Sequence, residues 1–471
     1  MGDSHKLDVS GVVGAQTRRR FVARTAAAGS MVAAGGVLAA CGSSKKSSGS
    51  DVSSTVGSGS KPKPAAAGSA TGQELQKILG KPTNLLAKGP GTFKIAGQFA
   101  ISGAGSVYGL QQTAGFKYGA QHVAEWTNNK VQFDTKYYDN KSGVPQAEAA
   151  AGRQAGLSKV PVLISSYIFG FGAIVPFAKQ YKMFTPDPGG GAGPIPGPFA
   201  PQPYCYGFRA GYPTDCLDGI FKYLSETFPS KKKYVLVQPV IAPPYNNAVS
   251  DYTKKLYSQY GVQKAGELLA PLGATDYSST IQKVKQLNPD VVIWTTFGTD
   301  PAYQAKEMLR QGVKCINAGV DHTSVVTKLA GAAWKDWYFG FDYLDVNGPS
   351  PWTKFFVENW KKDHNGETPN YYNAGDYITA FAVATLMERI LAAGGDINNG
   401  DDYVKALEAD PSFPHVYGGT ATEVGKIVID PKTHSPSALT MQLFQDKGTG
   451  NVADITPLAT YGIKAADFQK V

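Results

Sequence analysis

Residues 93–109, FKIAGQFAISGAGSVYG, join an apolar strand, a loop of small residues and the start of a helix. Apolar and small side chains dominate positions 93–101, and positions 102–106 hold only Ser, Gly and Ala. A helical pattern opens at Tyr108. A helix that starts directly after a strand points unpaired backbone N–H groups at whatever lies beyond the strand's carboxyl end. We therefore expect this loop to form one wall of a ligand-binding site.

The same strand–helix alternation continues along the chain. Strands are expected at 131–138, 160–164, 183–185, 234–238, 262–269, 291–295 and 313–318, and helices at 108–126, from 145, and at 170–181, 213–228, 245–260, 276–287 and 300–311. A Gly/Pro-rich loop at 186–203 divides them into two sets. This pattern predicts an α/β protein of two Rossmann-like lobes with parallel sheets, and a small-molecule cleft between the carboxyl ends of the sheets.

The first 90 residues have the order of an export signal followed by a tether. Three consecutive arginines, 18–20, precede an apolar run at 26–40 that is too short to span a membrane. The basic region resembles a twin-arginine export signal, and Leu-Ala-Ala-Cys at 38–41 resembles a bacterial lipobox. Residues 1–40 are therefore expected to be a signal peptide, Cys41 the lipid-modified residue on the outer face of the cell membrane, and 41–90 a flexible tether.

The net charge, the cysteines and the histidines bear on whether the protein binds nucleic acid, forms a disulfide or holds a metal ion. The formal net charge is +9, but nine basic and only three acidic residues precede residue 73, so the excess is weak support for nucleic-acid binding. Cys205 and Cys216 are close enough in sequence for a disulfide across a strand-to-helix corner, and the alternative is that they and Cys315 are buried thiols. The histidines are scattered, so no metal site is expected.

From about residue 93 to 444 the chain resembles the substrate-binding proteins of branched-chain amino acid ABC transporters, which have the type I periplasmic-binding fold. The resemblance is carried by landmarks in a fixed order: Ile101-Ser102-Gly103 with Tyr108-Gly109, Tyr138-Asp139-Asn140, Leu163-Ile164-Ser165-Ser166, Thr185-Pro186, Gly207-Phe208-Arg209, Thr275-Asp276-Tyr277-Ser278, Asn288-Pro289-Asp290 and Tyr371-Tyr372-Asn373-Ala374. No single landmark is specific, but the series is.

The resemblance implies two lobes joined by a three-strand hinge. Lobe 1 is expected at 91–209 and 340–414 and lobe 2 at 210–339 and 415–471, with hinge crossings near 209–211, 339–341 and 414–418. The ligand contacts that the resemblance implies are Ser102, Tyr108, Ser166, Tyr167, Asp187, Tyr245, Phe297 and Asp321. In that arrangement hydroxyl and N–H donors hold a carboxylate, and Asp321 holds an ammonium group.

The chain departs from an amino-acid site after Thr185-Pro186. Family members usually have small residues and then a Thr that holds the ligand carboxylate, whereas this chain has Asp187-Pro188-Gly189. Asp187 would repel a carboxylate, and Tyr167 replaces a small polar residue. An amino acid, an amide, an amine and an aromatic compound therefore all remain candidate ligands.

The expected function is capture of a small polar ligand for delivery to an ABC transporter permease by a monomer without a cofactor, metal or nucleic acid. One alternative is a lipoprotein that senses its ligand without feeding a transporter. A second is an NAD-type enzyme, but the glycines at 103, 105 and 109 lack the G-x-G-x-x-G spacing and no catalytic constellation is evident. We therefore do not expect an enzyme.

Overall fold

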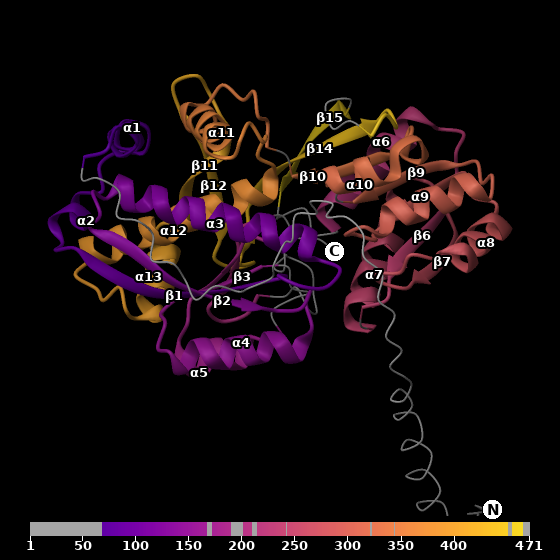
Figure 1. The fold of residues 1–471 in the computed structure, drawn as a ribbon. Coiled ribbons are helices and arrows are strands. Elements are labelled where there is room, and N and C mark those ends of the chain that lie inside the picture. The colour runs from indigo at the N-terminus through magenta and orange to yellow at the C-terminus, as the bar shows by residue number, and fades with distance from the viewer. Residues whose placement is uncertain are drawn as a thin grey trace, which may run out of the picture. The chain divides into compact units, whose positions relative to one another are not determined.

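The stretch at 93–109 forms the predicted strand, loop and helix, with β1 at Gly91–Phe99 and α3 at Ser106–Trp126 (Figure 1). The structure is a computed structural model, which describes residues 68–166, 172–189, 201–209, 214–241, 243–320, 323–342, 344–450 and 455–464. All of them belong to one unit of the chain, 58–471. The predicted signal peptide and Cys41 lie outside the described residues.

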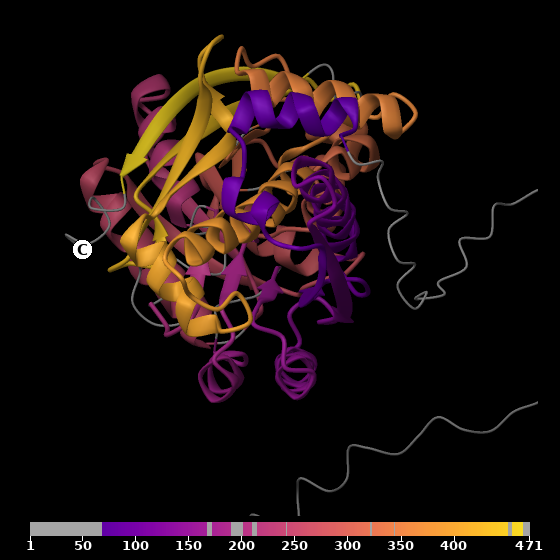
Figure 2. The same ribbon diagram turned by 90° about the vertical axis from the view of Figure 1, so that its left-hand side faces the viewer.

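The first lobe is built on parallel strands in the order β2-β1-β3, with β4 paired to β5 and an isolated bridge joining the residues that precede β3 and β4. Helices α4 and α5 cover one face of these strands, and α3 and α12 cover the other (Figures 1 and 2). The elements are β2 (Val131–Asp139), α4 (Pro145–Leu157), β3 (Leu163–Ser165), α5 (Val175–Tyr181), β4 (Thr185–Asp187), β5 (Cys205–Gly207), α11 (Pro351–Asp363), α12 (Tyr371–Ala392) and α13 (Gly400–Ala409).

Local chemistry sets the ends of these helices. Pro145 stands in the first turn of α4, where a missing N–H costs nothing. Asn370 caps α12 and forms a reciprocal capping box with Asn373. Between α3 and α12, Gly115 and Gly119 allow the two backbones to approach closely, because an added Cβ on Gly115 would lie 2.2 Å from the carbonyl oxygen of Asn373.

The second lobe is a seven-stranded sheet in the order β15-β14-β10-β9-β8-β6-β7. The five strands from β6 to β10 run parallel to one another, and β14 and β15 add antiparallel edges. The elements are α6 (Thr214–Thr227), β6 (Lys233–Pro239), α7 (Pro243–Gln259), β7 (Gln263–Ala270), α8 (Ser278–Leu287), β8 (Val291–Trp294), α9 (Asp300–Arg310), β9 (Ile316–Val320), α10 (Ser324–Ala330), the 3-10 helix η1 (Gly331–Trp334), β10 (Tyr338–Asp342), β14 (Ala438–Asp446) and β15 (Ile455–Lys464).

The chain after α13 differs from the predicted boundaries. Strands β11 (Ser412–Gly419), β12 (Val424–Asp430) and β13 (Ser435–Pro436) form a separate antiparallel sheet, and β11 packs on α11 and α12 of the first lobe. The expected hinge at 414–418 thus lies inside β11, and the chain joins the second sheet only at β14. The expected crossing at 339–341 lies inside β10, between β9 and β14.

Two short helices fold where a flexible tether was expected. Helices α1 (Ala70–Leu79) and α2 (Thr83–Ala87) bury Leu75 and Leu85 against the first lobe. The carboxylate of Glu388 on α12 accepts the backbone N–H groups of Asn84 and Leu85 at 2.8 and 2.7 Å. We call residues 69–87 the strap; a distant carboxylate that caps α2 is invisible to local sequence patterns.

Candidate functional site

The hydroxyl of Ser102 is used within the first loop. It donates to Asp139, at the end of β2, at 2.5 Å, and Asp139 also accepts the backbone N–H groups of Ile101 and Ser102 at 3.1 Å. Burial opposes ionisation of Asp139, but these hydrogen bonds and one from Lys141 outweigh it and lower the pKa of Asp139. Ser102 is exposed and anchors the loop to the neighbouring strand.

Tyr108 connects the first loop to the second lobe. Its ring is buried, and its hydroxyl accepts the backbone N–H of Gly298, which follows β8. Its ring also lies 4.7 Å from the ring of Tyr372 at the start of α12. Gly298 has a φ of +70° and directly follows the buried Phe297, so Tyr108 contacts the segment that contains Phe297.

Ser166 keeps a buried hydroxyl without a hydrogen-bond partner. Its backbone is fixed on both sides, because its N–H donates to the carbonyl of Gln98 at 3.1 Å and its carbonyl accepts the side-chain amide of Asn140 at 2.8 Å. The residue therefore has a fixed position beyond β3 and a hydroxyl available to a ligand.

Asp187 lies beside Ser165 at the same edge of the first lobe. It is the last residue of β4, is fully buried, and accepts the N–H of Gly189 at 2.6 Å. Two more buried acids feel its charge: Glu148 on α4 and Asp376 on α12. Burial, reinforced by Asp187, raises the pKa of Glu148 to about 8.

Asp376 and Arg209 complete this region, and sequence reasoning did not single out either as a site residue. Burial raises the pKa of Asp376 well above its usual range; Asp187 raises it further and Arg209 opposes the shift. The guanidinium of Arg209 lies 4.8 and 5.1 Å from the ring centres of Tyr371 and Tyr372. One feature of the sequence could have pointed to Asp376: it is the only charged residue in the part of α12 that precedes Glu388.

The second-lobe predictions are described only in part. Tyr245, on α7, is buried, and burial raises the pKa of its hydroxyl. Tyr167 and Asp321 lie outside the described residues. The structure thus collects Ser166 and Asp187 at one sheet edge and places Tyr108 against the segment that contains Phe297, while their roles as ligand contacts remain predictions.

Of the two alternatives for Cys205 and Cys216, the structure has the free thiols and not the disulfide. Cys205 and Cys216 are both buried thiols. Cys205 belongs to a small core cluster with Ala96 and Leu163 under α4 and α5, whereas Cys216 packs on α6 in the main core with Leu217. Closeness in sequence did not bring the sulfurs together, because the two residues belong to different packing layers.

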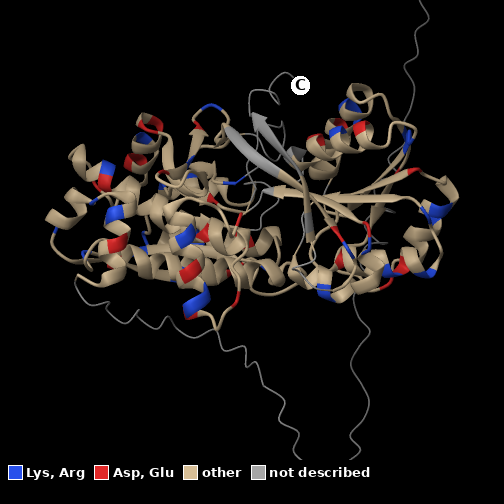
Figure 3. Cartoon of the chain, turned by 90° about the horizontal axis from the view of Figure 1, so that it is seen from above, with Lys and Arg blue, Asp and Glu red and all other residues tan. Residues whose placement is uncertain are grey.

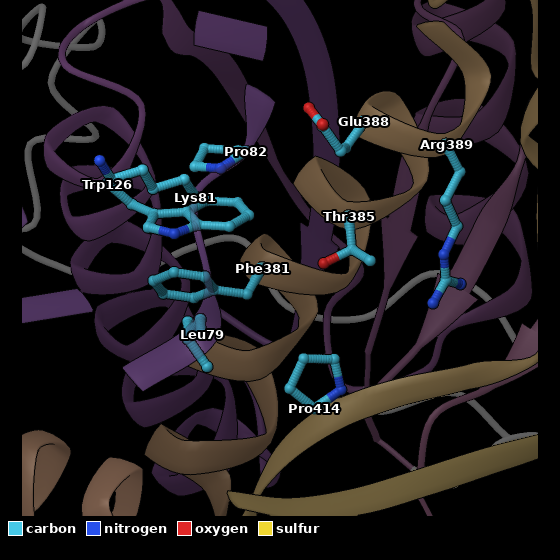
Figure 4. A pocket seen from close by; sticks show the side chains of 9 residues that line it. All are labelled: Leu79, Lys81, Pro82, Trp126, Phe381, Thr385, Glu388, Arg389 and Pro414. Carbon is cyan, nitrogen blue, oxygen red and sulfur yellow. The ribbon is translucent and has the colours of Figure 1, made fainter. Parts of the chain in front are cut away.

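A separate cavity of about 220 Å³ lies under the strap (Figure 4). Trp126 and Phe381 form its apolar wall, and Glu388 and Arg389 bring charge to its rim. Both charges are already engaged: Glu388 caps α2, and Arg389 donates to the carbonyls of Asp410 and Ser412 at 2.6 Å. The cavity is thus a packing gap between the strap and α12.

The described residues contain no group of three His, Cys, Asp or Glu side chains that could hold a metal ion. They also include no helix of the length and apolarity that crossing a membrane requires. Lys and Arg are interspersed with Asp and Glu on the helices (Figure 3), so these helices do not present the single-sign stripe typical of nucleic-acid binding.

Two α/β lobes, with buried polar groups at the carboxyl edge of the first sheet and a tyrosine linking the lobes, define a class of two-lobed binding proteins. A model of the family described as "Periplasmic binding protein" matches residues 92–449. The chain therefore belongs to this family, and the expected family and α/β fold are confirmed.

The sequence identity to individual curated relatives is low. Over 179 residues the chain is 26% identical to the Leu/Ile/Val-binding protein homolog 1 of Brucella abortus, a match that covers 37% of this chain and 45% of the relative. The match thus spans less than half the length of that curated relative.

Solved structures show the same fold. The substrate-binding protein LivJ of Streptococcus pneumoniae, in complex with isoleucine, aligns with a TM-score of 0.62 at 18% identity over 79% of this chain and all of that one. A solute-binding protein of R. palustris in complex with benzoate aligns with a TM-score of 0.65 at 16% identity over 79% of this chain and 98% of that one.

Proposed function

We propose that this chain is an extracytoplasmic solute-binding lipoprotein that captures a small polar ligand between its lobes and delivers it to an ABC importer. Family membership supports binding as the task, since the relatives in the comparisons include amino-acid and benzoate binders. The observation that carries the proposal is the buried, unpartnered hydroxyl of Ser166, held in place by Gln98 and Asn140 beyond a parallel strand.

The proposed ligand contacts lie in both lobes. Lobe 1 contributes Ser166, Tyr167 and Asp187, with Ser102 and Tyr108 at the rim, and lobe 2 contributes Tyr245, Phe297 and Asp321. Ligand binds one lobe, and closure buries it against the other.

A thermal-shift panel of amino acids, amides, amines and aromatic acids tests the binding function. A ligand at a hundred times its Kd is expected to add about 2.7 kcal/mol to the free energy of unfolding. A panel that leaves the melting temperature unchanged in every class would count against a receptor. Delivery is tested separately: a strain without this gene should lose uptake of the radiolabelled ligand, whereas a sensor would change transcription with uptake intact.

We also propose that the chain is exported by the twin-arginine route and anchored by lipid on Cys41. Support comes from the order of basic region, apolar run and Leu-Ala-Ala-Cys. Metabolic labelling with palmitate should mark the wild-type chain and a Cys315→Ala control equally, and should miss Cys41→Ala. Full labelling of Cys41→Ala would refute the anchor.

A further inference from the structure

The carboxyl edge of the first sheet carries several buried oxygens without hydrogen-bond partners. They are Gln98 Oε1, Ser166 Oγ, Glu148 Oε1 and both carboxylate oxygens of Asp376. All four side chains are less than 5% exposed. Buried polar atoms in native proteins are nearly always paired, so each orphan requires an explanation. Four residues from four different elements share this property.

Hydrogen bonds and strand register place Gln98 and Ser166 at this edge independently of the acids. The side-chain amide of Gln98 donates to Ser165 Oγ at 2.7 Å, and the backbone of Gln98 holds Ser166. The parallel bridge between the residues before β3 and β4 sets a register in which Ser165 lies opposite Asp187. Because strand side chains alternate between faces, Gln98, Ser165 and Asp187 lie in one row on the same face.

The ionisable side chains near this edge are mainly acids, which favour a ligand group that is positively charged and donates hydrogen bonds. Asp187 interacts electrostatically with both Glu148 and Asp376, and the positive charge that acts on Asp376 is that of Arg209. Arg209 in turn is stacked against aromatic rings at the start of α12. Asp187 is therefore the acid that links Glu148 and Asp376, and Arg209 is the cation that acts on Asp376.

We propose that this edge, formed by Gln98, Glu148, Ser166, Asp187 and Asp376, receives an organic cation through its N–H groups. The inference rests on the proposed binding function and assigns the ligand's head group. The orphan atoms are oxygens, and an ammonium group brings three donors and no acceptor to them. A metal ion is a poorer fit, because no three carboxylate, imidazole or thiol groups among the described residues are close enough to hold one. A carboxylate head group would place a further negative charge beside Asp187 and would oppose ionisation of Glu148 and Asp376.

The test uses the full chain and two carbon skeletons, each with three head groups. The compounds are benzylamine, benzamide and benzoate, and isopentylamine, isovaleramide and isovalerate. Within at least one skeleton, isothermal calorimetry should show the amine binding at least tenfold more tightly than the amide and the acid. Tighter binding of an acid or an amide would overturn the inference and leave the proposed function standing. No binding by either amine at 10 mM (roughly the upper limit for a weak site) would also overturn it, while the wider panel still decides whether the chain is a receptor.

Replacing Asp376 with asparagine distinguishes a ligand-binding role of its carboxylate from a structural role. Asp376→Asn keeps the shape of the side chain but cannot ionise when a cation arrives, so it should weaken amine binding at least tenfold without lowering the melting temperature of the unliganded chain. The matched control is Asp300→Asn: Asp300 is equally buried but accepts the N–H of Gly273 at 3.0 Å, so its replacement should lower the melting temperature. If Asp376→Asn destabilises the chain as Asp300→Asn does and leaves amine affinity unchanged, the carboxylate is structural and the inference fails.

Amine binding should also release protons. Glu148 and Asp376 have raised pKa values in a region that also holds Asp187, Arg209, Tyr137 and the buried thiol of Cys205, which feels the charge of Asp187. An arriving cation favours the ionised carboxylates, so amine affinity should rise from pH 6 to pH 8. Calorimetry in two buffers of different ionisation enthalpy measures the protons released. Proton uptake, or affinity that falls over this range, would contradict the assignment.

Discussion

Replacing Gly115 with alanine should force α3 and α12 apart. The new Cβ would lie 2.2 Å from the carbonyl oxygen of Asn373 and 2.8 Å from its Cα, well inside the shortest separation that real Cβ atoms show. The obstructing atoms are backbone, and Asn373 is fixed by the capping box and by its side-chain bond to the carbonyl of Gln111 at 3.0 Å. A rotamer change therefore cannot relieve the clash.

Two effects of opposite sign determine how much Gly115→Ala lowers the free energy of unfolding. Overpacking a well-packed interior costs about 1–3 kcal/mol and occasionally more, and rigid backbone contact favours the upper part of this range. Alanine regains about 1 kcal/mol of helix propensity over glycine. The net loss should be about 2 kcal/mol. Unfolding entropy of about 2.1 cal/mol/K per residue gives roughly 0.8 kcal/mol/K for a domain of about 400 residues, so the melting temperature should fall by about 2–3 °C.

Urea denaturation followed by tryptophan fluorescence measures this loss directly, with Gly89→Ala as the control. A Cβ on Gly89 meets no atom within 4 Å, so that variant should unfold like wild type. Gly115→Ala should also weaken ligand binding, because Tyr372 and Asp376 stand on the displaced turns of α12. An unchanged or raised midpoint for Gly115→Ala would refute the close-packing argument.

Three other changes test separate features. Glu388→Ala removes the cap of α2 and should speed tryptic cleavage within 68–90 several-fold, whereas the exposed Glu74→Ala should not; equal rates would contradict a docked strap. Tyr108→Phe leaves a buried N–H of the second lobe without its acceptor and should cost about 1–3 kcal/mol in urea denaturation; an unshifted midpoint would show that the bond contributes nothing. Burial lowers the pKa of His415 to about 3, so the unfolded state binds a proton that the folded state excludes, and stability falls as the pH drops below 6.5. His415→Gln should remove about 1.4 kcal/mol of that loss per pH unit between 6.5 and 4, seen as a flatter acid denaturation profile; a profile as steep as wild type would exclude His415 as its source.

Strand and helix periodicity predicted the α/β architecture because each lobe buries its sheets between helices. The opening strand, the start of α4 at Pro145 and the turn that begins at Asp139 all follow from short-range patterns. Residues 415–436 were assigned to the second lobe because local sequence cannot tell which sheet a strand joins. The strap was missed for a related reason: its stability depends on Glu388, some 300 residues away.

The candidate site was predictable only where loops follow strands. Ser166 and Asp187 were proposed because the family resemblance places ligand contacts where strands end, and the structure places Ser166 directly after β3 and Asp187 at the end of β4. Asp376 and Glu148 lie on helices, and only the fold shows that they approach Asp187. Arg209 was recognised as a family landmark, yet its stacking on Tyr371 depends on a helix that begins about 160 residues later.

The structure also changes the expected chemistry of the opening loop. Its helix N-terminus was expected to point unpaired N–H groups beyond the strand, but the N–H groups of Ser106, Tyr108 and Gly109 already donate to carbonyls of the loop, and the N–H of Gly105 donates to Ser142 Oγ. Those donors are used, as are the hydroxyls of Ser102 and Tyr108. The unpartnered buried atoms at this end of the first lobe include the amide oxygen of Gln98 and carboxyl oxygens of Glu148 and Asp376, together with the hydroxyl of Ser166, which can donate or accept. Donor groups on a ligand would pair with these carboxyl and amide oxygens, and this is why we propose that a positively charged end of the ligand faces the first lobe.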